Sequence, residues 1–277
     1  MPSDKRQRQK EREHAAREAR QAAERRKQQR KTWYAIGGIT AFVLALAFAY
    51  STFLGDDDGD ESASDTTAQT SDEEATPTTV DPALQADCPA EDGSSEQRLE
   101  FDAPQQDCLV AGATYEAVFD TTAGEIRVAL DTETTPQTAN NFIVLSRYHY
   151  YDDIEIFRSN TGIDILQSGS PHTNTSSDPG PGYTIADEGG PFTYEAGDLV
   201  MARTAAPNSA SAQFFFSTGP RTASLDAQGT YVVFGTVTEG MDVLEAIIAT
   251  HVDSGSSPGE GAPNPVPVIN SITIVQT

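Results

Sequence analysis

The sequence has 277 residues, 42 of them acidic and 18 basic, and a formal net charge of −24. Twelve basic residues lie within the first 31 positions; beyond Lys31 there are 6 arginines, no lysine and 37 acidic residues, a charge of −31. A surface this acidic repels nucleic-acid phosphates and anionic lipid headgroups, which argues against nucleic acid as a partner. The length accommodates one or two domains.

The N-terminal region predicts a membrane anchor. Residues 1–31 are rich in Arg, Gln and Glu, a composition typical of a solvated helix or a disordered tail. Residues 32–54 carry no charge, and as a helix of about 1.5 Å per residue they would reach about 33 Å, enough to span a bilayer. The basic flank before this segment and Asp56 to Asp58 after it predict a cytoplasmic N-terminus and an exported remainder.

A cleaved signal peptide is the competing interpretation of the same region. Ala47-Phe48-Ala49 has the small-x-small form of a processing site. The basic region is unusually long and the apolar run exceeds a typical signal core, so we favour an uncleaved, single-pass cell-membrane anchor. Both interpretations place the rest of the chain outside the cytoplasm.

The next two segments predict a linker and a disulfide-closed element. Residues 55–87 are acidic and polar with little apolar material, which is typical of a disordered tether. Cys88 and Cys108 are the only cysteines, and both lie on the predicted exported side, where a disulfide is expected. Their spacing is too wide for a redox C-x-x-C pair, and two cysteines without a nearby histidine make poor zinc ligands. We expect the element 88–111 to attach the linker to the domain of residues 112–277.

That domain begins with a strand pattern followed by a helix pattern. Tyr115, Ala117 and Phe119 alternate with polar residues, and a turn at Thr122–Gly124 leads into a second alternating run, which predicts a hairpin. Pro136 marks the first position of a helix whose apolar stripe continues until Arg147.

The C-terminal half adds strands and a second helix. In Gln213-Phe214-Phe215-Phe216, the strand period of two places Phe214 and Phe216 on one face and Gln213 and Phe215 on the other. A short helix is expected after Gly240, a surface loop from Asp253 to Pro267, and a last strand from Val268 to Val275. The pattern predicts a mainly β fold, a closed antiparallel barrel capped by two helices, preceded by the transmembrane helix.

Several motifs in residues 112–277 resemble, in order and spacing, those of the cyclophilin family of peptidyl-prolyl cis–trans isomerases. They are Pro136–Phe142, Tyr148–Asp153, Phe157-Arg158, Gln167–Gly169, Leu199–Ala202, Gln213–Phe216, Leu225-Asp226, Tyr231–Val237 and Glu239–Val243. The resemblance implies a cyclophilin-like barrel that isomerises X-Pro bonds in polypeptides. Rotation about an amide needs no nucleophile, metal or cofactor, so we expect none.

The resemblance also implies roles for individual residues. Arg158 stands where the family has its catalytic arginine. Gln167 and Gln213 match the two glutamines that hydrogen-bond substrate backbone, and Phe215 matches the floor of the proline pocket. Further substrate-binding positions are those of Ala202, Leu225 and Tyr231.

Two residues of the loop before Gln167 depart from the family pattern. Asp164 stands where a pocket phenylalanine is usual, and Ile165 stands at a methionine position. A carboxylate there would make the proline pocket wetter. Because the loop is one residue longer than its common form, Ile163 is the alternative occupant of the pocket.

These departures leave a second function open. Ser224 replaces a usual tryptophan or phenylalanine, which predicts weak cyclosporin binding. The alternative to an exported isomerase is a catalytically weak binding module or chaperone of the same fold that holds proline-containing segments.

Overall fold

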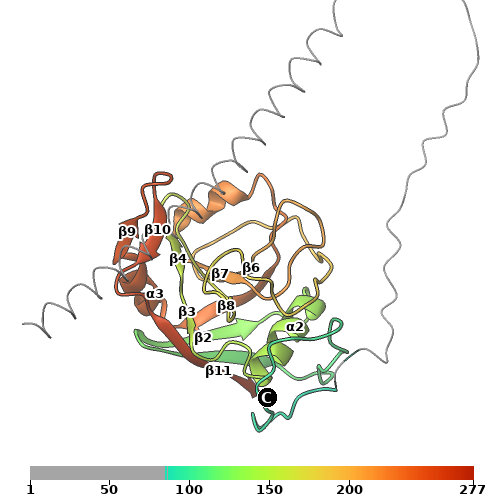
Figure 1. Ribbon diagram of the computed structural model, residues 1–277. Coiled ribbons are helices and arrows are strands. Elements are labelled where there is room, and N and C mark those ends of the chain that lie inside the picture. The colour runs from blue at the N-terminus through green and yellow to red at the C-terminus, as the bar shows by residue number, and fades with distance from the viewer. Residues whose placement is uncertain (1–84, 86) are drawn as a thin grey trace, which may run out of the picture. The chain divides into compact units, whose positions relative to one another are not determined.

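The computed structural model describes residue 85 and residues 87–277 (Figure 1). The basic tail 1–31, the predicted anchor 32–54 and almost all of the linker 55–87 lie outside the described residues. Within the described part of the chain, no helix combines the length and apolarity needed to cross a bilayer.

The domain is built on one antiparallel sheet of 11 strands. Its strands are β1 (Tyr115–Thr121), β2 (Gly124–Leu130), β3 (Ile154–Glu155), β4 (Arg158–Asn160), β5 (Ile165–Ser168), β6 (Asp198–Met201), β7 (Phe214–Ser217), β8 (Val233–Glu239), β9 (His251–Asp253), β10 (Glu260–Pro263) and β11 (Val268–Gln276). The order across the sheet is β3-β11-β1-β2-β8-β6-β7-β5-β4-β10-β9. The sheet curves around a central core (Figure 1).

The predicted hairpin is confirmed. β1 and β2 pair in register, with Phe119 opposite Ile126, and both side chains are fully buried. Alternate residues of β1 face the interior because side chains of a strand point to opposite sides. β1 also pairs with the last strand, β11, so the two ends of the domain lie side by side.

The sheet is an open barrel, and the predicted closed barrel is confirmed only in part. β3 and β9 are the end strands of the ladder, and no ladder pair among the described residues joins them. The chain passes from β3 to β4 through Ile156-Phe157, where it leaves its partner β11 and pairs instead with β5 and β10. The backbone itself therefore bridges the two parts of the sheet at this point.

Both predicted helices are present. α2 (Pro136–Arg147) starts with Pro136 at its first turn and packs against β11 and β8, and α3 (Met241–Ile248) packs against β2 and β5. The Glu188 carboxylate accepts hydrogen bonds from the N–H groups of Gln137 (3.1 Å) and Thr138 (2.5 Å), so a negative charge lies at the α2 N-terminus. A short 3-10 helix, η2 (Pro220–Leu225), was not predicted.

The segment from Asp253 to Pro267, predicted as a surface loop, instead contributes to two strands. β9 and β10 form a hairpin, and β10 also pairs with β4 through Glu260 and Gly261. These strands lack apolar alternation because backbone hydrogen bonds, rather than a buried face, hold them. At Gly261 any Cβ would collide with the Val252 carbonyl oxygen, so the close approach requires glycine.

The predicted disulfide is confirmed. Cys88 and Cys108 are bonded, with their Cα atoms 5.6 Å apart. Between them, the Phe101 ring is buried and its N–H donates to the Pro181 carbonyl oxygen at 2.8 Å. The Cys108 N–H donates to Oδ1 of Asn140 on α2 at 2.8 Å. The disulfide-closed segment is thereby attached to the domain at two places.

Candidate active site

The domain contains two hydrophobic clusters, and strand β7 contributes residues to both. Phe214 and Phe216 belong to the larger cluster inside the barrel, whereas Phe215 belongs to a smaller cluster on the opposite face. The predicted alternation along β7 is therefore confirmed. The smaller cluster includes Ile165 and Val200, and it forms the apolar part of a cavity.

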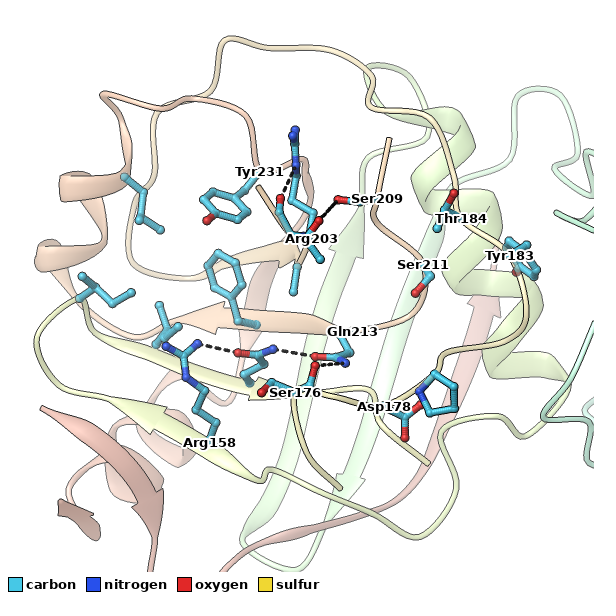
Figure 2. A pocket seen from close by; sticks show the side chains of 18 residues that line it. Arg158, Ser176, Asp178, Tyr183, Thr184, Arg203, Ser209, Ser211, Gln213 and Tyr231 are labelled. Carbon is cyan, nitrogen blue, oxygen red and sulfur yellow. Dashed lines mark hydrogen bonds between the residues drawn. The ribbon is translucent and has the colours of Figure 1, made fainter. Parts of the chain in front are cut away.

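The cavity has a volume of about 430 Å³. Its lining residues are Arg158, Ile163, Ile165, Gln167, Ser176, Asp178, Pro179, Tyr183, Thr184, Ala202, Arg203, Thr204, Ser209, Ser211, Gln213, Phe215, Leu225 and Tyr231 (Figure 2). Nine of the ten predicted catalytic and substrate-binding residues are among them. Asp164 is the exception.

A chain of hydrogen bonds runs along one wall of the cavity. Nη1 of Arg158 donates to Oε1 of Gln167 at 2.6 Å, and Nε2 of Gln167 donates to Oε1 of Gln213 at 2.8 Å. Nε2 of Gln213 donates to the Ser176 carbonyl oxygen at 3.3 Å (Figure 2). Strand register accounts for the first contact, because Arg158 on β4 lies directly opposite Gln167 on β5.

The same register places the aromatic floor beside these polar groups. Gln167 lies opposite Phe215 on β7, and the Phe215 ring is 4% exposed. The Tyr231 ring meets it edge to face at a centroid distance of 5.9 Å. The cavity therefore combines a guanidinium, two amides and an apolar floor.

Tyr194 fixes the backbone of Tyr231 through two hydrogen bonds. Its hydroxyl donates to the Tyr231 carbonyl oxygen at 3.0 Å and accepts from the Tyr231 N–H at 2.9 Å. Burial raises the pKa of Tyr194 to about 12, so the hydroxyl stays protonated and keeps both contacts.

The description of the matching family model is cyclophilin-type peptidyl-prolyl cis–trans isomerase, and it covers residues 117–274, more than half of the chain. The chain belongs to the cyclophilin family. It is thereby placed among the isomerases.

Individual cyclophilins show how far the similarity extends. Peptidyl-prolyl cis–trans isomerase B of Bacillus subtilis is 38% identical over 121 residues, which are 43% of this chain and 79% of that protein. Peptidyl-prolyl cis–trans isomerase cyp15 of Rhizopus delemar is 32% identical over 144 residues, which are 51% of this chain but only 22% of that protein.

A solved cyclophilin from Cryptosporidium parvum supports the fold assignment. That crystal structure, determined in the presence of the dipeptide Ala-Pro, has a TM-score of 0.50 and 27% sequence identity. The similarity covers 58% of this chain and 98% of that one.

The cyclophilin pocket differs from expectation at Asp164, which does not line the cavity. The residue has a left-handed backbone (φ 51°), and its carboxylate accepts hydrogen bonds from Arg221 N–H (2.9 Å) and Nε (2.8 Å). Ile163 and Ile165 line the cavity instead. The Asp164 carboxylate is directed at Arg221 on η2, so the structure fits the alternative with Ile163 at the pocket and not the wetter pocket.

Arg203 is the second guanidinium of the cavity, and contacts within the domain engage most of it. Nη1 donates to Asp187 (2.8 Å) and to the Thr230 carbonyl oxygen (3.2 Å), while Nη2 donates to the Ala206 carbonyl oxygen (2.9 Å). Its side chain is only 9% exposed. Arg203 therefore organises the surrounding loops of this cyclophilin.

Asp178 likewise organises a loop at the polar end of the cavity. Burial alone raises the pKa of its carboxyl, but hydrogen bonds from the Gly180 N–H, His172 and Thr173 outweigh that effect and lower the pKa below its ordinary value. Asp178 is consequently ionised near neutral pH and occupied by contacts within the domain.

Glu260 contacts the site through Arg158, and sequence reasoning did not single it out. Its carboxylate contacts Arg158, although 102 positions separate the two residues. No local signal could have found it, since it lies in the segment predicted as a surface loop.

Proposed function

We propose that this cyclophilin isomerises X-Pro bonds of exported or cell-surface polypeptides, with the proline ring against Phe215 and the prolyl amide beside Arg158. The observation that supports this most directly is that the Arg158 guanidinium and the Phe215 ring line the same cavity. Its volume of about 430 Å³ is in the usual range of small-molecule pockets.

The proposed chemistry is non-covalent assistance of amide rotation. The barrier of about 18 to 20 kcal/mol arises from amide resonance, and a twisted amide has a pyramidal nitrogen that can accept a hydrogen bond. A guanidinium offers five N–H donors and is always charged, so it suits this acceptor. The contact accelerates rotation only to the extent that it strengthens in the twisted state.

Arg158 retains donors for this role. Its three side-chain nitrogens each make a hydrogen bond within the described residues: Nε and Nη2 to Glu260, and Nη1 to Gln167. Each Nη carries a second N–H, which these contacts leave available. Gln167 and Gln213 would hold the substrate backbone, and Ala202, Leu225, Tyr231, Ile163 and Ile165 would surround the ring.

A catalytically weak binding module remains the second candidate, and Ser224 favours it. This exposed serine on η2 leaves the cavity without the large ring that is usual in the family at this position. Such a domain would still bind proline-containing segments through its apolar floor.

A protease-coupled isomerisation assay on a prolyl tetrapeptide distinguishes the two candidates. We expect Arg158→Ala to lower kcat/KM by about 100- to 1,000-fold, the usual effect of removing a transition-state donor. Arg127→Ala is the matched control, since Arg127 on β2 does not line the cavity. Equal background rates for wild type and Arg158→Ala would identify the binding module.

We further propose that residues 32–54 hold the domain at the outer face of the cell membrane. The Cys88–Cys108 bond supports this placement, because disulfides persist in oxidising compartments. Trypsin added outside intact cells should then reach the domain, whereas a cytoplasmic marker should stay intact. Protection of both would contradict the proposed orientation, and the mass of the mature chain distinguishes an anchor from a cleaved signal peptide.

Weak cyclosporin binding is also proposed. Ser224 on η2 is exposed and offers no large ring beside the cavity. Titration with cyclosporin should therefore require much higher concentrations than a cyclophilin with tryptophan at this position, and Ser224→Trp should tighten binding.

A further inference from the structure

Strand β10 brings one carboxylate to the guanidinium of Arg158. Oε1 of Glu260 accepts from Nε of Arg158 at 2.5 Å, and Oε2 accepts from Nη2 at 2.8 Å. Two parallel contacts of this kind fix the plane of a guanidinium as well as its position. Both side chains are about three-quarters buried, with exposed fractions of 27% and 26%.

Glu260 is itself held from several sides. Nδ2 of Asn160 donates to its Oε2 at 2.7 Å, and Ser254 donates to its carbonyl oxygen through its N–H at 2.8 Å. The Asn160 side chain also accepts from the Ile163 N–H at 3.2 Å, which ties the carboxylate to the apolar wall of the cavity. The carboxylate is therefore placed by the fold before any peptide binds.

The charge state of Glu260 agrees with this geometry. The hydrogen bond from Arg158 is the main cause that lowers the pKa of Glu260 below its ordinary value, against a smaller opposing effect of burial. Asn160 and the nearby His251 act in the same direction as Arg158. The carboxylate is therefore ionised near neutral pH, and in this state both of its oxygens can accept hydrogen bonds from Arg158.

The bidentate pair determines which donors of Arg158 face the cavity. With Nε and Nη2 engaged by Glu260, Nη1 is the nitrogen directed at Gln167 and the hydrogen-bond chain. Without Glu260 the long arginine side chain would regain rotamer freedom. The Gln167 contact alone would not define the guanidinium plane.

We propose that Glu260 is a positioning residue. It orients the Arg158 guanidinium for contact with the twisted prolyl amide. This inference rests on the proposed function. Glu260 does not line the cavity, so it acts through Arg158 and not by contact with the peptide. Its loss should therefore lower kcat and leave KM nearly unchanged, because ground-state binding relies on the apolar floor and the two glutamines.

The test compares variants of the full-length chain in kcat and KM for a prolyl tetrapeptide. Glu260→Gln offers one acceptor instead of two and should lower kcat about 10-fold, with KM within about two-fold. Glu260→Asp keeps the charge and both oxygens and should recover part of the loss. Glu245→Gln is the matched control, since Glu245 is exposed on α3 and should behave as wild type.

An NMR readout separates positioning from general destabilisation. In the wild type, the bidentate contact should give a protected Arg158 Nε–H signal, assigned by its loss in Arg158→Lys. Glu260→Gln should broaden or shift that signal while the backbone amide spectrum stays that of the wild type. Unchanged kcat in Glu260→Gln, or a kcat loss that follows melting temperature and is not recovered in Glu260→Asp, would overturn the proposal.

The pattern across variants shows which idea has failed. If Arg158→Ala is inactive and Glu260→Gln has the wild-type kcat, only the positioning role is wrong. If wild type, Arg158→Ala and Glu260→Gln all show background rates, the proposed isomerase function fails and the positioning role fails with it.

Discussion

Neighbouring phenylalanines on β7 have different roles, although all are buried. Phe216 is fully buried inside the barrel, where its ring meets Phe119 at 5.2 Å and Phe214 at 5.8 Å. Phe215 points to the opposite face and lines the cavity, and only 4% of its surface is exposed. Burial alone therefore does not distinguish a residue that maintains the fold from one that forms the site.

The difference lies in what surrounds each ring. The interior cluster encloses Phe216 on all sides, so truncation there leaves an enclosed cavity. Phe215 has a packed side towards Val200 and Ile165 and an open side towards the cavity. The two faces of β7 should consequently respond differently to mutation.

The largest stability effect is expected at the interior face. Phe216→Ala should lower the free energy of unfolding by about 3 to 5 kcal/mol, because the surrounding rings cannot close the space. Urea unfolding measures this directly, and Phe216→Leu should lose clearly less. A loss below about 1 kcal/mol for the alanine variant would contradict the comparison.

The disulfide provides a reference that lies on neither face. Replacing Cys88 and Cys108 together by serine should lower stability by about 3 kcal/mol, since the bond closes a loop with a sequence separation of 20. Neither cysteine lines the cavity, so kcat/KM below the melting temperature should stay unchanged. A large activity loss in the folded variant would show that this segment influences the site.

The cavity face should show the opposite balance between stability and activity. Phe215→Ala removes apolar burial without enclosing a new void and should lower the free energy of unfolding by about 2 kcal/mol. Because the ring forms the floor under the proline, kcat/KM should fall far more than in the disulfide variant. Unfolding and isomerisation are measured on the same Phe215→Ala preparation. Full activity in this variant would refute the difference proposed between the two faces of β7.

A smaller effect is expected at Asp164, which turns away from the cavity. Asp164→Asn weakens the contacts with Arg221 and should lower stability by about 1 kcal/mol. Its kcat/KM should remain within about two-fold of wild type, since the cavity walls beside it are Ile163 and Ile165. A markedly altered peptide KM would instead place the carboxylate in the pocket.

The smallest effect concerns the pH dependence of the Arg158–Glu260 pair. The pKa of folded Glu260 lies below its ordinary value of 4.5, so its contribution to stability is complete above that value. The contribution is lost as the pH falls through the folded pKa. The stability difference between wild type and Glu260→Gln should therefore shrink on acidification below pH 4.5, as urea midpoints at several pH values would show.

Much of the site could be predicted from sequence because it depends on strand period and motif spacing. The alternation along β7 predicted that Phe215 faces the opposite side from Phe214 and Phe216. The family resemblance predicted that Arg158, Gln167 and Gln213 share one site. Glu260 could not be predicted in the same way. Its strand is held by backbone hydrogen bonds to β4, and these leave no side-chain pattern in the sequence.

The sequence by itself determined the β1–β2 hairpin, the helix that starts at Pro136, and the alternation of Phe214, Phe215 and Phe216, because each follows from local periodicity and backbone preference. Only the tertiary structure decided that Asp164 turns towards Arg221 and that β10 brings Glu260 to Arg158. Both outcomes depend on contacts between segments more than 50 positions apart, where a left-handed turn or a backbone ladder decides the direction of a side chain.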